Sequence, residues 1–179
     1  MIFREAPLAG AFLLELERRT DERGYFARSF CVQEFVAHGL PTAVMQCNVS
    51  FNHTRGTLRG MHFQRSPMAE AKLVRCTRGA IYDVIIDLRQ ESPTYCRWYG
   101  AELTEENGSA IFIPEGFAHG FQTLADSSEV FYQMFAGYSA EHAAGVRWDD
   151  PAFSISWPLP VSTIAEKDQA FPLLKDMVR

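Results

Sequence analysis

The sequence predicts an all-β protein, built as a sandwich or barrel of short strands. About eight β-rich segments follow one another at regular spacing, and turn residues separate most of them. Aromatic residues make up 13% of the chain and Phe alone numbers 14, which suits the pleated faces of sheets. The length of 179 residues predicts a single domain, residues 1–179, with one sizeable core.

The predicted strands occupy the middle of the chain. They are expected at residues 43–51, 56–64, 71–79, 80–89, 97–104, 109–117, 118–124 and 129–138. Between them lie polar or glycine-containing turns at residues 52–53, 78–79, 91–93, 106–108 and 126–128. Only short helices are expected beside these strands. One is predicted within residues 29–39, with Ser29 as its N-cap and Gly39 as its stop, and a second lies around residues 162–170.

Alternation within residues 80–89 separates two faces of one strand. Tyr82, Val84 and Ile86 share one face with Leu88, while the carboxylates of the strand lie on the other face. Those carboxylates are Asp83 and Asp87. A central strand with carboxylates on one face predicts either a polar cavity inside the barrel or a solvated outer face.

Composition and charge exclude several classes of function. With 17 basic and 22 acidic residues the net charge is −5, and no long basic run is present, so nucleic-acid binding is not expected. Charges interrupt the apolar runs of the first 24 residues, so neither a signal peptide nor a membrane span is expected there. The cysteines, Cys31, Cys47, Cys76 and Cys96, form no close pair in the sequence, which favours reduced thiols.

Residues 108–120, GSAIFIPEGFAHG, carry a motif of glycine, proline and histidine. The spacing of Gly108, Pro114, Gly116 and His119 resembles the second motif of cupins, which are jelly rolls also described as double-stranded β-helices. Cupins that bind a metal also carry two histidines, as H-x-H, on an earlier strand. Here Gln64 follows His62 at that spacing, and Glu70 is poorly placed to replace it. Because iron, manganese and zinc need three or four such ligands, no metal site is expected.

His62 lies in the predicted strand GTLRGMHFQ. A lone histidine on a strand is commonly a packed residue with its hydrogen bonds satisfied. Arg59 is three residues away and would face the opposite side of a regular strand, but Gly60 between them permits a bulge that turns both toward one cavity. His62 is therefore interpreted either as a packed residue or as a residue of the site.

Lys72 and two tyrosines are further candidates. A lysine on a buried strand is costly unless it is paired or functional, so Lys72 is either paired with an acid such as Asp83, poised over a substrate, or on the rim. Tyr132 and Tyr138 lie in or just after an apolar strand. A phenol that points into a cavity can act as a general acid.

These segments together resemble one family, the dTDP-4-dehydrorhamnose 3,5-epimerases, which are metal-free cupins of bacterial deoxysugar synthesis. The resemblance covers nearly the whole chain. It is carried by DERGYF, QCNVS, GTLRGMHFQ, KLVRCTRGAIYDVIIDLRQESPT, IPEGFAHGF, VFYQ, GVRWDDPAFSISWP and EKD.

The resemblance implies a role for each matching residue. His62 matches the catalytic base, Tyr132 the general acid, and Asp168 the carboxylate that orients the histidine. Lys72, beside His119, matches the group that faces the keto oxygen of the sugar. The resemblance implies further substrate-binding residues at Arg23, Gln46, Asn48, Arg59, His119, Tyr138 and Lys167. Of these, Tyr138 matches an aromatic that stacks on the thymine, and Arg23 an arginine that reaches the neighbouring subunit's site in a homodimer with strand exchange.

The implied activity is epimerisation at C3 and C5 of a nucleotide-linked 4-keto-6-deoxyhexose, without a cofactor. Imidazole can remove a proton α to a ketone if the enolate is stabilised, and a phenol can return a proton on the opposite face. Alternatives are a single-centre epimerase, a different nucleotide, a non-catalytic sugar-nucleotide-binding cupin and a metal-dependent cupin. A cytoplasmic protein is expected, since activated sugars are made there.

Some positions depart from the family pattern, which usually has Phe, Glu and an acidic residue where this chain has Arg19, Arg28 and Ala143. In the resemblance these positions belong to the nucleoside end of the site. Gln133 replaces a common Lys, and Phe63 a common Tyr. We hypothesise that nucleotide recognition has changed while proton transfer is kept. The alternative is tolerated variation around a diphosphate that supplies most of the binding.

Overall fold

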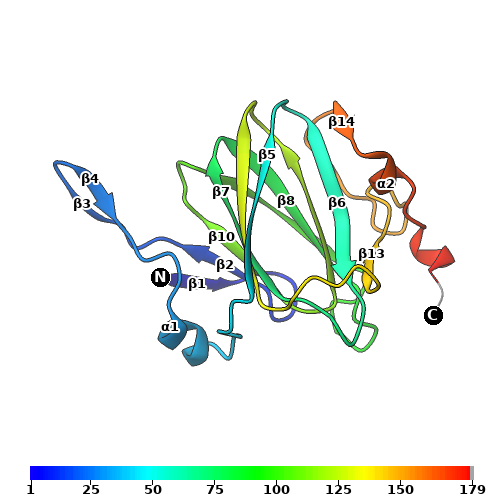
Figure 1. The fold of residues 1–179 in the computed structure, drawn as a ribbon, viewed down its shortest axis with the longest axis horizontal. Coiled ribbons are helices and arrows are strands. Elements are labelled where there is room, and N and C mark those ends of the chain that lie inside the picture. Colours follow the sequence, from blue (N-terminus) through cyan, green and yellow to red (C-terminus); the bar gives the residue numbers. More distant parts are fainter. Residues whose placement is uncertain (178–179) are drawn as a thin grey trace.

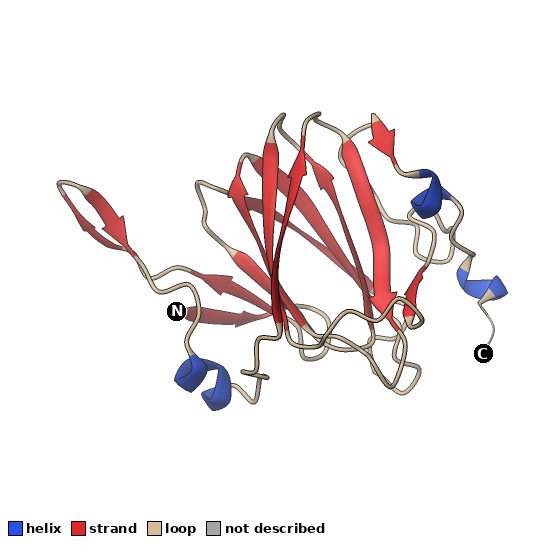
Figure 2. Ribbon diagram, viewed as in Figure 1, coloured by secondary structure: helices blue, strands red, loops and turns tan. Residues whose placement is uncertain are grey.

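Two sheets face each other in the computed structural model, which describes residues 1–177 (Figure 1 and Figure 2). The first sheet has six strands in the order β1 (Ile2–Glu5), β2 (Phe12–Glu15), β10 (Ala110–Ile113), β7 (Lys72–Arg78), β12 (Ser128–Met134) and β5 (Gln46–Asn52). The second has the order β13 (Ala143–Gly145), β6 (Thr57–Gln64), β11 (Phe117–Thr123), β8 (Ala80–Asp87) and β9 (Trp98–Thr104). A further strand, β14 (Thr163–Ile164), pairs in parallel with β6.

Strands β5 to β12 have the topology of a jelly roll. One sheet takes them in the order β5-β12-β7-β10 and the other in the order β6-β11-β8-β9, and all these neighbours are antiparallel. Each four-strand set is half of the two-sheet Greek-key arrangement of cupins. The predicted all-β, cupin-type jelly roll with short flanking helices is therefore confirmed.

The predicted strands correspond to β5 to β12, and most boundaries agree within a few residues. Two predicted strands run past the observed ones. Strand β12 ends at Met134 and not at residue 138, and Pro114 ends β10, where a turn with Gly116 at φ 78° leads into β11. Strands β1, β2, β13 and β14 were not predicted. They have two to four residues each, too few to show a clear alternation.

The helices are short, as expected, but one predicted cap is wrong. Helix α1 spans Val32–Ala37 with Cys31 at its N-cap position, and no side chain caps it, so Ser29 does not have the predicted role. Gly39, at φ 69°, follows the C-cap residue as predicted, because glycine adopts the left-handed conformation without strain. The second predicted helix is α2 (Glu166–Gln169), and a 3-10 helix, η1 (Leu174–Asp176), follows it.

The two faces of β8 pack in different places. Ile81 and Ile85 belong to the core between the sheets. Val84 and Ile86 pack on the outer side against residues of the C-terminal segment such as Phe153. The predicted parity is thus confirmed. Asp83 and Asp87 are both fully buried, so a solvated face for them is wrong.

A two-stranded hairpin, β3 (Arg19–Asp21) and β4 (Gly24–Phe26), extends away from the barrel (Figure 1). It forms its own sheet and pairs with no other strand described in residues 1–177. Tyr25 and Phe26 are 51% and 74% exposed on it. These two neighbouring side chains give the hairpin an exposed apolar surface.

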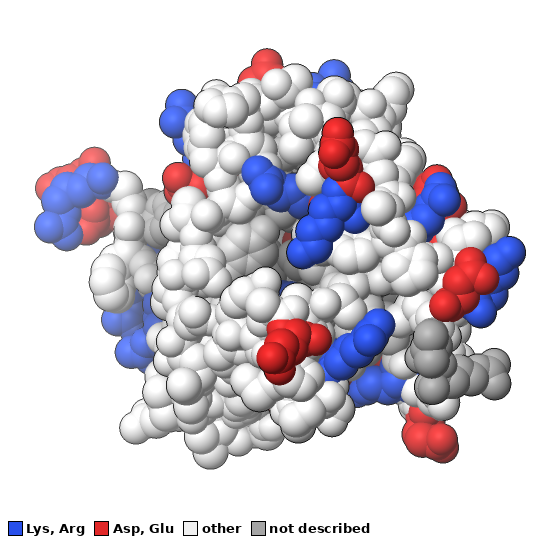
Figure 3. Space-filling view, turned by 45° about the vertical axis from the view of Figure 1, so that its right-hand side comes forward, with Lys and Arg blue, Asp and Glu red and all other residues white. Residues whose placement is uncertain are grey.

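On the face drawn in Figure 3, basic and acidic side chains are interspersed, without a large patch of either sign. No helix described between residues 1 and 177 has the length and apolar character needed to cross a membrane.

Candidate active site

A cavity of about 500 Å³ opens into the barrel between the two sheets. Strands β5, β7 and β12 of the first sheet and β6 and β11 of the second supply most of its wall. It is lined by Gln46, Asn48, Val49, Ser50, Arg59, His62, Glu70, Lys72, His119, Gly120, Phe121, Tyr132, Met134 and Tyr138. Most of the site residues predicted from the sequence are therefore brought together.

A pair of glycines lets β6 and β11 approach closely at this cavity. A Cβ on Gly60, which has φ 137°, would lie 2.5 Å from the Cα of Gly120. A Cβ on Gly120 would lie 2.6 Å from the carbonyl oxygen of Arg59. The pairing register shifts here, between His119 and Phe121. Arg59 and His62 both line the cavity, although they would face opposite sides of a regular strand. This agrees with the irregularity predicted at Gly60.

His62 is held from behind by a carboxylate of α2. Its Nε2 lies 2.8 Å from Asp168 Oδ1, and the N–H of Gly60 donates to Asp168 Oδ2 at 3.1 Å. Burial would raise the pKa of Asp168, but the hydrogen bond and charge of His62 and the Gly60 N–H lower it below its usual value. Asp168 is therefore ionised at neutral pH and accepts a hydrogen bond from the Nε2–H of His62, which leaves Nδ1 of the neutral ring with a lone pair. The His62 side chain is 44% exposed, so the packed-residue interpretation is wrong.

His119 lies directly opposite His62 on the neighbouring strand and has a carboxylate of its own. The two histidines are Cα partners in the β6–β11 ladder. Nε2 of His119 lies 2.8 Å from Oδ2 of Asp83, and both side chains are buried. The other oxygen of Asp83 has no hydrogen-bond partner among residues 1–177.

Tyr132 faces His119 from the other sheet. Its ring lies 6.1 Å from that of His119, edge to face. Burial, and then the charge of Asp83, raise the pKa of Tyr132 above its usual value. The phenol therefore stays protonated at neutral pH, the state that a proton donor needs.

Lys72 is buried and paired, but with a different acid from the one predicted. Its Nζ lies 2.8 Å from Oε1 of Glu70, while Asp83 is occupied by His119. Lys72 is 4% exposed, so the rim interpretation is also wrong. Lys72 does not pair with Asp83 because Glu70, two residues earlier in the chain, supplies its carboxylate.

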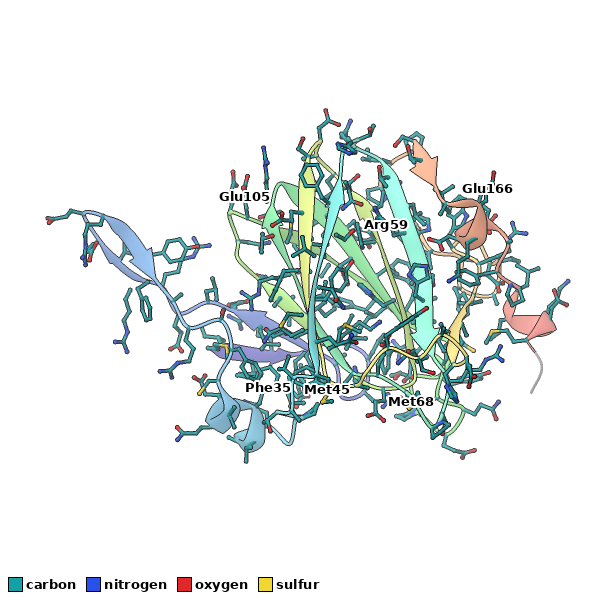
Figure 4. All side chains as sticks on the ribbon, in the orientation of Figure 1. Phe35, Met45, Arg59, Met68, Glu105 and Glu166 are labelled. Atoms are coloured by element: carbon teal, nitrogen blue, oxygen red, sulfur yellow. The ribbon has the colours of Figure 1, made fainter. Side chains whose placement is uncertain are left out.

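Arg59, Gln46 and Tyr138 lie on the open side of the cavity. Figure 4 shows Arg59 on β6, from which its Nε donates to Oδ1 of Asn52 on β5 at 2.7 Å. Gln46 accepts a hydrogen bond from the backbone N–H of Tyr138 at 2.9 Å. The Tyr138 ring itself is 65% exposed and available for stacking.

Other predicted residues lie outside this cavity. Arg23 is at the end of the hairpin, paired with Asp21 at 2.5 Å, and Lys167 is exposed on α2. Arg19 and Arg28 line a smaller cavity of about 160 Å³ near the base of the hairpin. Ala143 lies in β13, opposite Gln64 of β6.

Three parts of the site were not predicted from the sequence: Glu70 as the partner of Lys72, the pairing of Asp83 with His119, and the apolar wall of Phe121 and Met134. The pairing of Asp83 with His119 depends on the register between β8 and β11, which the sequence does not show. Among residues 1–177, no three His, Cys, Asp or Glu side chains are grouped so as to hold a metal ion.

Fold and site together define an enzyme-like cupin whose cavity holds two His–Asp pairs, a Lys–Glu pair and a protonated tyrosine. Residues 5–176 match the model of the dTDP-4-dehydrorhamnose 3,5-epimerase family, and the chain belongs to this family of isomerases.

Similar proteins carry the same description. The dTDP-4-dehydrorhamnose 3,5-epimerase of Sinorhizobium fredii is 43% identical over 99% of this chain and 91% of the relative. The crystal structure of the Bacillus anthracis 3,5-epimerase with TDP and pyrophosphate bound superposes with a TM-score of 0.93 at 40% identity, covering 97% of this chain and 99% of that one.

Two more distant matches carry specific functional names. The Legionella pneumophila 3,5-epimerase, solved in complex with dTDP-4-keto-L-rhamnose, has a TM-score of 0.92 at 33% identity, covering 99% of this chain and 94% of that one. The dTDP-4-dehydrorhamnose 3-epimerase of Streptomyces niveus is 36% identical over 98% of this chain and 85% of the relative. The family thus contains proteins described as acting at two centres and at one.

Proposed function

We propose that this protein inverts C3 and C5 of a dTDP-linked 4-keto-6-deoxyhexose in deoxysugar biosynthesis of the dTDP-L-rhamnose type. The observation that carries the proposal is the placement of a histidine–aspartate pair on one sheet and a protonated tyrosine on the other, across one cavity. A sugar held between the sheets then meets a base on one side and an acid on the other.

His62 is the proposed base. Its Nδ1 takes the proton from the carbon next to the ketone, and Asp168 stabilises the imidazolium that results through the Nε2 hydrogen bond of 2.8 Å. The electron pair of the broken C–H bond moves to the ketone oxygen and gives an enolate. Tyr132 returns a proton to the carbon from the opposite face, which inverts the centre.

Lys72 is the proposed donor to the enolate oxygen, and His119 lines the same cavity. Each side chain is hydrogen-bonded to a carboxylate, Lys72 to Glu70 and His119 to Asp83. Donors fixed before the reaction are worth more than solvent, because they need no reorganisation when charge develops.

The nucleotide end of the substrate is assigned to the open side of the cavity. Gln46, Asn48 and Arg59 would hold the diphosphate and sugar, and Tyr138 would stack on the base. Lys167, exposed beside Asp168, would contact the substrate at the edge of the cavity. Arg59 suits this role, since its Nε is fixed by Asn52 and the rest of the guanidinium can bind phosphate in two places.

A homodimer completes the site in this proposal. The projecting hairpin carries Arg23 away from its own cavity and exposes Tyr25 and Phe26, which suits insertion against a second copy with strand exchange. Arg23 would then reach the partner's cavity. A cytoplasmic location fits a protein that acts on activated sugars.

Proton NMR in D₂O with dTDP-4-keto-6-deoxyglucose tests the proposal. Deuterium entering both C3 and C5, and lost in His62→Ala, is expected. Exchange at one carbon would instead support a single-centre enzyme, like the Streptomyces niveus relative named above. Binding without any exchange, also with CDP-, UDP- and GDP-linked ketosugars, would contradict an epimerase and favour a sugar-nucleotide-binding cupin.

A further inference from the structure

Glu70 places a negative charge inside a cavity that is proposed to take an anionic substrate. Its carboxylate lines the cavity, and its side chain is only 10% exposed. Such a charge repels a diphosphate and is costly to bury, so it needs a compensating role.

Lys72, the partner of Glu70, would be poorly fixed without it. Lys72 begins β7, where its backbone lies between Ile113 of β10 and Met134 of β12, and its side chain turns inward. A lysine ammonium is a point charge on a stem with four rotatable carbon links, so the backbone position alone does not fix it. Within residues 1–177, the side chain of Lys72 makes its one hydrogen bond to Glu70, at 2.8 Å.

The Lys72–Glu70 pair repeats an arrangement found elsewhere in the cavity. His62 is held by Asp168 and His119 by Asp83, and in each case the nitrogen–oxygen distance is 2.8 Å. Each carboxylate makes a hydrogen bond with one nitrogen of its partner side chain. The other ring nitrogen of each histidine, or the other N–H bonds of the lysine, can then face the cavity. The ammonium of Lys72 has three N–H bonds, so two remain for a substrate oxygen after one is given to Glu70.

We propose that Glu70 is a positioning residue for the epimerisation, which acts by holding the Lys72 ammonium where the ketone oxygen becomes an enolate. This inference rests on the proposed function. Because the ammonium interacts more strongly with the enolate than with the ketone, its displacement lowers kcat more than it raises KM.

A double-mutant cycle of Glu70→Ala and Lys72→Ala tests this role, with kcat and KM measured for the ketosugar. Glu70→Ala is expected to lower kcat about tenfold with KM changed less than about threefold. Lys72→Ala is expected to lower kcat roughly 10²- to 10³-fold. In the Lys72→Ala background, Glu70→Ala is expected to cause no further loss, or a small gain, because it removes a buried carboxylate that has lost its partner.

Two further variants separate positioning from a general effect on folding. Glu70→Gln keeps an oxygen acceptor of the same shape and is expected to have a kcat between wild type and Glu70→Ala. Glu115→Ala, at an exposed glutamate in the turn before β11, is the matched control and should leave both constants unchanged.

The proposal is overturned if Glu70→Ala lowers kcat by the same factor with and without Lys72, or if it leaves kcat unchanged in the wild-type background. It is also overturned if the loss falls on KM alone. Wild-type protein that shows no exchange or turnover of any ketosugar overturns the proposed function as well, which is a different result from an additive cycle.

Discussion

Replacing Asp168 with asparagine should prevent His62 from acting as a base, although the side chain at position 168 keeps its shape. Asp168 accepts from Gly60 N–H through one oxygen and from His62 Nε2 through the other, at 3.1 and 2.8 Å. In Asp168→Asn, the amide oxygen has to face the Gly60 N–H, because two N–H groups cannot bond to each other. The amide NH₂ then faces His62 and requires Nε2 to accept.

The consequence is a change of tautomer. Neutral imidazole carries one proton, so a Nε2 that accepts forces the proton onto Nδ1, and the lone pair proposed to attack the sugar is lost. We expect Asp168→Asn to lower kcat about 10³- to 10⁴-fold. Asp168→Ala imposes no tautomer and loses only orientation and charge, so we expect it to be the more active variant, about 10²-fold below wild type.

Deuterium incorporation at C3 and C5 gives the rates, and ¹⁵N NMR of labelled His62 gives the tautomer directly. Wild type should show an unprotonated Nδ1 and Asp168→Asn an unprotonated Nε2. The reasoning is refuted if Asp168→Asn stays within tenfold of wild type, if it is faster than Asp168→Ala, or if its Nδ1 remains unprotonated.

Three other changes have defined outcomes. Tyr132→Phe should abolish the epimerised product while leaving proton exchange by His62 detectable, and NMR in D₂O distinguishes the two. Gly60→Ala should lower the free energy of unfolding by roughly 2–4 kcal/mol in urea titrations, because its Cβ would lie 2.5 Å from Gly120 Cα. Burial would raise the pKa of Asp87, but hydrogen bonds from Arg89 and neighbouring hydroxyls lower it to about 2 from an ordinary 3.8. Stability is therefore complete above about pH 4, and about 2 kcal/mol should be lost as the pH falls toward 2, a dependence that Asp87→Asn should flatten in acid titrations.

The strands of the jelly roll could be predicted because each carries its own signal. Alternation in residues 80–87 and glycine or polar turns between strands depend only on neighbours in the chain. The short strands β1, β2, β13 and β14 form because the sheet offers them edges, as when β13 pairs with β6. Their sequences are too short to show this beforehand. The exposure of the hairpin residues depends on the direction in which the hairpin projects from the barrel. A local sequence pattern does not predict that direction.

The site divides in the same way. His62, His119 and Tyr132 lie in recognisable motifs, and the structure brings them to one cavity. The carboxylates behind them depend on register instead. Asp83 reaches His119 because β8 pairs with β11, at a position two residues along the ladder from that histidine. Asp168 reaches His62 from a helix more than a hundred residues later in the chain.

The division of roles between the sheets explains why a barrel suits inversion at a carbon. Base and acid must approach opposite faces of one carbon, and two sheets that face each other across a cavity can present them from opposite sides. Here β6 supplies His62 and β12 supplies Tyr132, from different sheets that enclose the same cavity. Lys72, on the sheet of Tyr132, and His119, on the sheet of His62, line the same cavity, and Lys72 is proposed to hold the ketone oxygen there. One enolate oxygen can therefore be held while either neighbouring carbon is turned toward the acid and base, so inversion at C3 and at C5 needs one set of residues rather than two.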